Sequence, residues 1–119
     1  MNQYTIRAIV RSKKNSRRLF SNGGHMVSLV SKAYEQFRDE ALIELMTQRP
    51  KDLKPPYVIY YTFFCKARRF LDLDNAVTSV NDVLQDAHII GDDMDIVELH
   101  ARKNVGSKSD CTIIKILQP

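Results

Sequence analysis

The sequence contains few of the residues that mark a specialised class of protein. Its 119 residues include only 4 glycines and 4 prolines, which excludes a collagen-like or low-complexity chain. The 2 cysteines, Cys65 and Cys111, are far apart and show no CxxC spacing, so neither a zinc knuckle nor a disulfide framework is indicated. We therefore expect buried, reduced thiols in one globular domain that spans residues 1–119.

Long apolar runs are also missing. No stretch approaches the ~18 consecutive apolar residues of a membrane span, so we expect no membrane partner. Arg7 and Arg11 interrupt the first apolar segment, and no small-residue cleavage site follows it, so it does not match a secretion signal. The sequence thus predicts a cytoplasmic protein.

Charge of one sign is absent from two long segments. Residues 1–34 contain no Asp or Glu, and residues 70–101 contain no Lys or Arg. The second segment nevertheless holds eight carboxylates: Asp72, Asp74, Asp82, Asp86, Asp92, Asp93, Asp95 and Glu98. Like charges so close together repel one another unless a cation lies between them. The acidic segment therefore points to a divalent cation, and the basic segment, with the net charge of +4, points to a nucleic acid.

The hydrophobic pattern predicts an α+β fold in which two helices pack on a mixed β-sheet, in the order β-α-β-α-β-β. Ser28 is a suitable N-cap for the first helix, and Asp74 or Asn75 for the second. A long basic loop is expected at 12–27, and a polar turn at 104–109 is expected to join the last two strands as a hairpin. The strands are expected at 3–11, 57–65, 95–103 and 110–118, and the helices at about 28–48 and 74–87.

The strand at 57–65 stands out because it is apolar and aromatic without polar alternation. Such a run favours a central strand that is covered on both faces.

The chemistry is concentrated in the sequence Asp72-Leu73-Asp74-Asn75. Alternation in an extended segment would place Asp72 and Asp74 on the same side of the chain. Carboxylate oxygens are the ligands that Mg²⁺ and Mn²⁺ prefer. After the predicted second helix, Asp92 and Asp93 follow a glycine. One of these two carboxylates could approach Asp72 and Asp74 if the chain doubled back over the helix. With cations to hold phosphates, such a cluster is typical of a metal-dependent nuclease.

Purely structural explanations compete with this one. Carboxylates before a helix also serve as N-caps, and two Asp after a glycine also form ordinary turns. Asp82 and Asp86, four residues apart, are typical of a solvated helix face. The three histidines are typical of structural or surface positions. The basic loop is as typical of a solvated loop as of a phosphate-binding one. The residue pattern by itself leaves these alternatives open.

The chain resembles the RusA-type Holliday-junction resolvases, and the resemblance extends over its whole length. The Asp-Leu-Asp-Asn element with a later Asp-Asp pair is its most specific part. The resemblance implies a homodimer that makes paired symmetric nicks in four-way DNA junctions during recombination and repair. It implies that Asp72, Asp74 and Asp93 are the catalytic, Mg²⁺-binding residues, with Mn²⁺ as a possible substitute, and that Asn75, Thr78 and Asp92 are supporting residues. The residues expected to contact DNA are Lys13, Lys14, Asn15, Arg17, Arg18, Lys66, Arg68 and Arg69.

One position departs from the family pattern. Four residues after the second motif Asp, the family often has a Lys, and this chain has Thr78. Threonine supplies no cation to stabilise developing phosphate charge. Two alternatives stay open beside the nuclease, and Thr78 motivates the first of them. One is a junction-binding protein with weak or lost catalysis, and the other is an RNase that uses the same acidic cluster.

Overall fold

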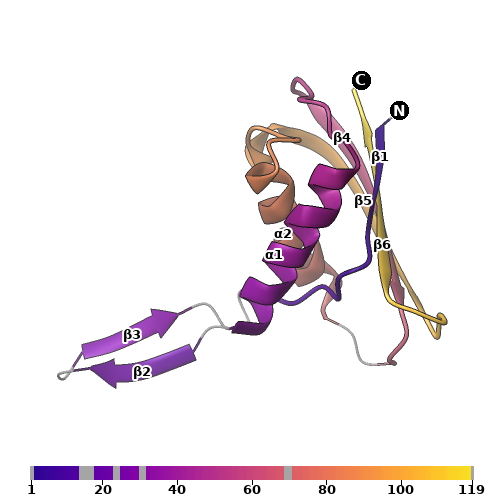
Figure 1. Cartoon of the computed structure of the whole chain (residues 1–119). Helices are drawn as coiled ribbons and strands as arrows, with labels where there is room; N and C mark the ends of the chain where they lie inside the picture. The colour runs from indigo at the N-terminus through magenta and orange to yellow at the C-terminus, as the bar shows by residue number, and fades with distance from the viewer. Residues whose placement is uncertain (1, 14–17, 23–24, 30–31, 69–70, 119) are drawn as a thin grey trace.

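The computed structural model of the protein describes residues 2–13, 18–22, 25–29, 32–68 and 71–118, and the side chains of 18–22 and 25–29 lie outside that description. Two helices pack on one face of a four-stranded sheet, and a two-stranded hairpin extends away from this body (Figure 1). The elements are β1 (Asn2–Ile6), β2 (Arg18–Asn22), β3 (His25–Leu29), α1 (Lys32–Thr47), β4 (Tyr57–Cys65), α2 (Leu73–Asp86), the short 3-10 helix η1 (Asp93–Asp95), β5 (Ile96–Val105) and β6 (Cys111–Leu117).

The predicted α+β class and the order β-α-β-α-β-β are confirmed, with the β2–β3 hairpin inserted before α1. None of the helices in the described part of the chain has the length and hydropathy needed to cross a membrane.

The strand order of the main sheet is β1-β6-β4-β5. β4 pairs in parallel with β5 and antiparallel with β6, and β1 pairs antiparallel with β6, so the sheet is mixed, as predicted. β4 has the predicted bounds, and its aromatic and β-branched residues suit an interior strand.

The parallel pairing of β4 and β5 requires the chain to cross back over the sheet between them, and α2 makes this crossover. A helix of 14 residues is about 21 Å long. The Tyr61 hydroxyl, from the middle of β4, hydrogen-bonds to the Asn81 side chain and holds α2 against the sheet. The inward-facing side chains are buried as predicted: Val77, Val80, Val83, Leu84 and, just beyond the helix, Ala87.

The first strand ends at Ile6 and not at residue 11. Glu44 of α1 explains the difference, because its carboxylate accepts the main-chain N–H groups of Arg7 and Ala8 at 3.0–3.1 Å. These two donors are therefore not available to a neighbouring strand. The chain leaves the sheet at this point, and its next residues pack along α1.

The predicted loop at 12–27 is wrong for half of its length, because β2 and β3 form an antiparallel hairpin there. Ser28 is a strand residue that pairs with Leu19, so it does not cap a helix, and α1 begins only at Lys32. The sequence did carry a hairpin signal, since apolar residues stand on both sides of two adjacent glycines.

The last two strands do not form the predicted hairpin, because β4 lies between them. Their connection passes over the end of β4, where the N–H groups of Gly106 and Ser107 donate to the Cys65 carbonyl at 2.8 and 3.0 Å. Gly106 has a φ of 89°, a conformation that favours glycine. The connection is thus fixed to the end of β4.

The prediction that β4 is covered on both faces is wrong for the single chain. Both helices pack on the same face of the sheet (Figure 1). On the other face Tyr60 is 39% exposed and stacks on His100, while Thr62 and Phe64 are half-buried. The buried residues of β4 on the helix side are Tyr57, Ile59, Tyr61, Phe63 and Cys65.

The two cysteines are free thiols, as predicted. Cys65 is buried, and burial raises the pKa of its thiol, whereas Cys111 is only half-buried.

Candidate active site and nucleic-acid interface

Two of the predicted site carboxylates lie at the amino end of α2. Asp72 is the N-cap residue, and Asp74 lies in the first turn, so the helix begins slightly before the predicted cap at Asp74 or Asn75. The Asp72 side chain makes no capping hydrogen bond, so N-capping does not account for that carboxylate. Both side chains are exposed, at the helix end where the macrodipole favours negative charge.

Two of the predicted supporting residues, Asn75 and Thr78, form hydrogen bonds with Asp74. The Asn75 main-chain N–H donates to Asp74 Oδ1 at 2.9 Å. The Thr78 hydroxyl donates to the Asp74 carbonyl at 3.0 Å, a common interaction of threonine inside a helix. Thr78 therefore brings no positive charge to the place where the family often has a lysine.

The second predicted pair, Asp92 and Asp93, lies beyond the other end of α2. Asp92 caps η1, and its side chain accepts the Met94 N–H at 2.9 Å. η1 leads directly into β5, whose first residue, Ile96, pairs with Tyr57 at the start of β4. Asp93 is thus near the start of β4.

The crossover helix therefore separates the predicted ligands. Asp72 and Asp74 lie at one end of α2 and Asp93 beyond the other, about 21 Å of helix apart. Within the part of the chain that the structure describes, no three His, Cys, Asp or Glu side chains are grouped closely enough to hold a metal ion. A single chain does not assemble the predicted three-carboxylate site.

A second charged cluster lines a groove of about 340 Å³ between α1 and α2: Lys13, Tyr34, Arg38, Asp82, Gln85 and Asp86. Lys13 Nζ lies 3.8 Å from Asp82 Oδ2. The prediction of a solvated face holds for Asp86, which is exposed, but is wrong for Asp82, which is half-buried. Sequence reasoning missed this cluster because its members come from three separate segments.

Burial and neighbouring charges shape the electrostatics of this groove. Burial raises the pKa of Asp82, Lys13 opposes the increase, and the carboxylates of Asp86 and Asp93 add to it. Burial, followed by the charges of Asp82 and Asp86, also raises the pKa of Tyr34 to about 12, and the Tyr34 hydroxyl is hydrogen-bonded to Asp82. Asp93 therefore acts on the carboxyl half of α2.

Three of the eight predicted DNA-contacting side chains belong to the described residues. Lys66 and Arg68 are exposed in the segment that joins β4 to Asp72, and Lys13 is paired with Asp82. Arg18 belongs to β2, but its side chain lies outside the description. The remaining predicted residues lie outside the described part of the chain: Lys14, Asn15, Arg17 and Arg69.

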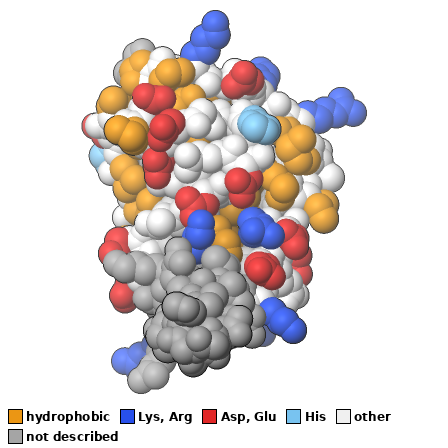
Figure 2. Space-filling model, turned by 90° about the vertical axis from the view of Figure 1, so that its left-hand side faces the viewer, with side chains coloured by type: hydrophobic (Ala, Val, Ile, Leu, Met, Phe, Trp, Pro, Cys, Tyr) orange, Lys and Arg blue, Asp and Glu red, His pale blue; other side chains and the backbone are white. Residues whose placement is uncertain are grey.

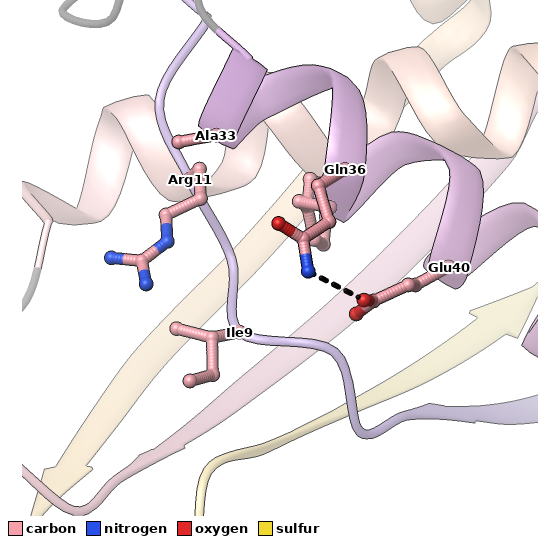
Figure 3. A pocket seen from close by; sticks show the side chains of 6 residues that line it. Ile9, Arg11, Ala33, Gln36 and Glu40 are labelled. Atoms are coloured by element: carbon pink, nitrogen blue, oxygen red, sulfur yellow. Dashed lines mark hydrogen bonds between the residues drawn. The ribbon is translucent and has the colours of Figure 1, made fainter.

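Residues 8–13 bring a further cation alongside α1. Arg11 and Ile9 face the helix across a small cavity of about 130 Å³, and the Arg11 guanidinium points away from the hydrogen-bonded side chains of Gln36 and Glu40 (Figure 3). The Ser79 hydroxyl donates to the Arg11 carbonyl at 2.7 Å and fixes this segment to α2. Acidic and basic side chains are interspersed over this side of the molecule (Figure 2).

The fold and these side chains define a class: a small α+β domain that presents paired carboxylates next to exposed cations, as proteins acting on a phosphodiester backbone do. The family model described as Endodeoxyribonuclease RusA matches residues 10–116, nearly the whole chain. The chain belongs to the RusA endodeoxyribonuclease family, which confirms the resemblance seen in the sequence. No individual curated protein matches it.

The raised pKa of Asp82 predicts a pH-dependent stability. Because the folded protein disfavours the charged carboxylate, wild-type stability falls as the pH rises through the folded-state pKa of Asp82. The variant Asp82→Asn stays neutral and lacks this fall. In urea denaturation, we expect the free energy of unfolding of the variant, relative to wild type, to increase as the pH rises above the ordinary Asp pKa of 3.8, and to level off above the folded-state pKa of Asp82. Lys13→Gln removes the cation that opposes the raised pKa of Asp82, so the free energy of unfolding of this variant should fall more steeply with pH than that of wild type. A difference that is constant or decreasing with pH would contradict this account.

Proposed function

We propose that this protein is a Mg²⁺-dependent endonuclease that resolves four-way DNA junctions by paired nicks, in recombination and repair, and that it acts as a homodimer. The observation that carries the proposal is the exposed pair Asp72 and Asp74 at the amino end of α2, in a chain of the RusA endodeoxyribonuclease family. Lys66 and Arg68, exposed just before this pair, would neutralise phosphates of the bound strand.

The homodimer follows from what one chain lacks. Asp93 belongs to the proposed site but lies beyond the far end of α2 from Asp72 and Asp74. Two copies that pair with their α2 helices running in opposite directions would bring Asp93 of each copy to the Asp72 and Asp74 of the other. A two-fold axis of this kind creates two equivalent sites, which matches two symmetric nicks.

A divalent ion would then be held across the two copies. Mg²⁺ takes hard oxygen ligands, commonly one or two carboxylates with waters, and Mn²⁺ accepts the same ligands. When bound, such an ion polarises a phosphate and lowers the pKa of a water molecule. The residues of this chain would contribute the negative charge that attracts the ion, while the nearby cations would orient the DNA strand.

Thr78 favours a second candidate, a protein that binds junctions with little or no cleavage. Its hydroxyl is bonded to the helix main chain, and threonine itself brings no cation to the place where the family often has a lysine. The two candidates share the same DNA and differ only in the metal-dependent step. Nicking assays therefore separate them.

Removal of single carboxylates tests the nuclease. Asp72→Asn or Asp93→Asn should lower Mg²⁺-dependent nicking of a synthetic four-way junction at least about 100-fold, because each removes negative charge from the proposed site. Gel shifts should show that junction binding survives. The matched control Asp52→Asn, exposed between α1 and β4, should nick like wild type.

Two wild-type results bear on the alternatives. Wild-type protein that binds the junction but never nicks it, with Mg²⁺ or Mn²⁺ present, would support the binding protein instead. A clear preference for RNA over both junction and duplex DNA would favour an RNase.

Mixed dimers test whether two copies share each site. We expect a heterodimer of Asp72→Asn and Asp93→Asn chains, isolated with two different tags, to recover nicking of one strand. In a shared arrangement one site carries both substitutions and the other carries neither, so one site stays intact. If each chain built its own site, both sites would be damaged, and the heterodimer would be as inactive as either parent. Failure of tagged chains to copurify would contradict the homodimer itself.

A further inference from the structure

A basic pocket lies at the end of the sheet where β1, β4 and β5 finish and β6 begins. The strand registers place these ends together, because Cys65 pairs with Val105, Phe64 with Cys111 and Ile6 is opposite Thr112. The cavity has a volume of about 370 Å³, and its lining residues come from three segments of the chain: Arg7, Ile9, Lys66, Lys108, Ser109 and Asp110.

Main-chain contacts hold the walls of this basic pocket in place. Glu44 binds the N–H groups of Arg7 and Ala8, which fixes the wall that follows β1. The Lys66 N–H donates to Asp110 Oδ1 at 3.1 Å, which ties the end of β4 to the start of β6. The pocket walls are therefore held by main-chain hydrogen bonds to Glu44 of α1 and to Asp110, and not by the lysine side chains themselves.

The balance of charge in the basic pocket is positive. Arg7, Lys66 and Lys108 are exposed, and none of them forms an ion pair with another described residue. Asp110 is the single carboxylate among the lining residues, and one of its oxygens already accepts the Lys66 N–H. The Ser109 hydroxyl adds a neutral donor. Three cations and one hydroxyl facing one cavity suit an anion that has several oxygens.

The basic pocket also lies at the end of the molecule where α2 begins. β4 ends at Cys65, the pocket residue Lys66 follows at once, and the same segment continues to Asp72 (Figure 1). We propose that the basic pocket binds a backbone phosphate of the DNA strand that passes the amino end of α2. This inference rests on the proposed function for the identity of the anion, and it adds Arg7 and Lys108 to the DNA-contacting residues.

The test compares two triple variants of equal charge. The pocket variant is Arg7→Gln, Lys66→Gln, Lys108→Gln, and the control is Lys51→Gln, Lys54→Gln, Lys115→Gln. The control lysines are also exposed but lie before β4 and in the middle of β6. Affinities for a four-way junction, a linear DNA duplex and an RNA duplex are measured without divalent metal over a series of salt concentrations. Equal thermal midpoints would show that both variants are folded.

We expect the pocket variant to bind both DNA substrates more weakly and to reduce the salt slope by about 0.9, the change that corresponds to one phosphate that is no longer neutralised. The control should keep a slope close to that of wild type. Equal changes in the two variants, a loss confined to RNA, or wild-type protein that binds no DNA would each overturn the proposal. If the pocket variant shows the expected loss of DNA binding but the wild-type protein never nicks a junction, the proposed nuclease is refuted and the phosphate-binding role of the basic pocket is supported.

Discussion

The parallel pairing of β4 with β5 is the constraint on which the candidate site depends. Two parallel neighbours cannot be joined by a tight turn, so α2 must carry the chain from one end of the sheet to the other. The core that α2 buries, together with the hydrogen bond from Tyr61 to Asn81, fixes this helix along its length. As a consequence, Asp74 and Asp93 lie at opposite ends of α2, and one chain does not bring them together.

The same constraint gives the two ends of the molecule different electrostatic characters. At the amino end of α2, exposed carboxylates stand beside Lys66, Arg68 and the basic pocket. At the carboxyl end, the charge of Asp93 contributes to the raised pKa of the half-buried Asp82 in the groove between the helices. The exposed cations at the first end suit contact with a phosphodiester backbone.

Apart from the β2–β3 hairpin, which was mistaken for a loop, the sequence predicted local features better than long-range ones. β4 was found with its bounds because an apolar run between prolines and a basic segment is a local signal. Asp72 and Asp74 could be singled out because the Asp-Leu-Asp-Asn motif is contiguous, and their role stays a prediction. The distance between Asp72 and Asp93 could not be predicted, because it depends on which strand pairs with β4, and hydrophobic periodicity does not specify strand pairing. The early end of β1 depends on Glu44, and the basic pocket joins Arg7 to Lys108, so both required the folded chain.

The most direct measurement is anomalous scattering from crystals of the protein soaked in Mn²⁺. We predict a manganese peak at the junction of two copies, next to Asp72 and Asp74 of one copy and Asp93 of the partner subunit. A peak held within one chain, for example by Asp82 and Asp86 in the groove between the helices, would contradict a site shared by two copies. So would a peak at Asp72 and Asp74 with no acidic residue of a second copy nearby.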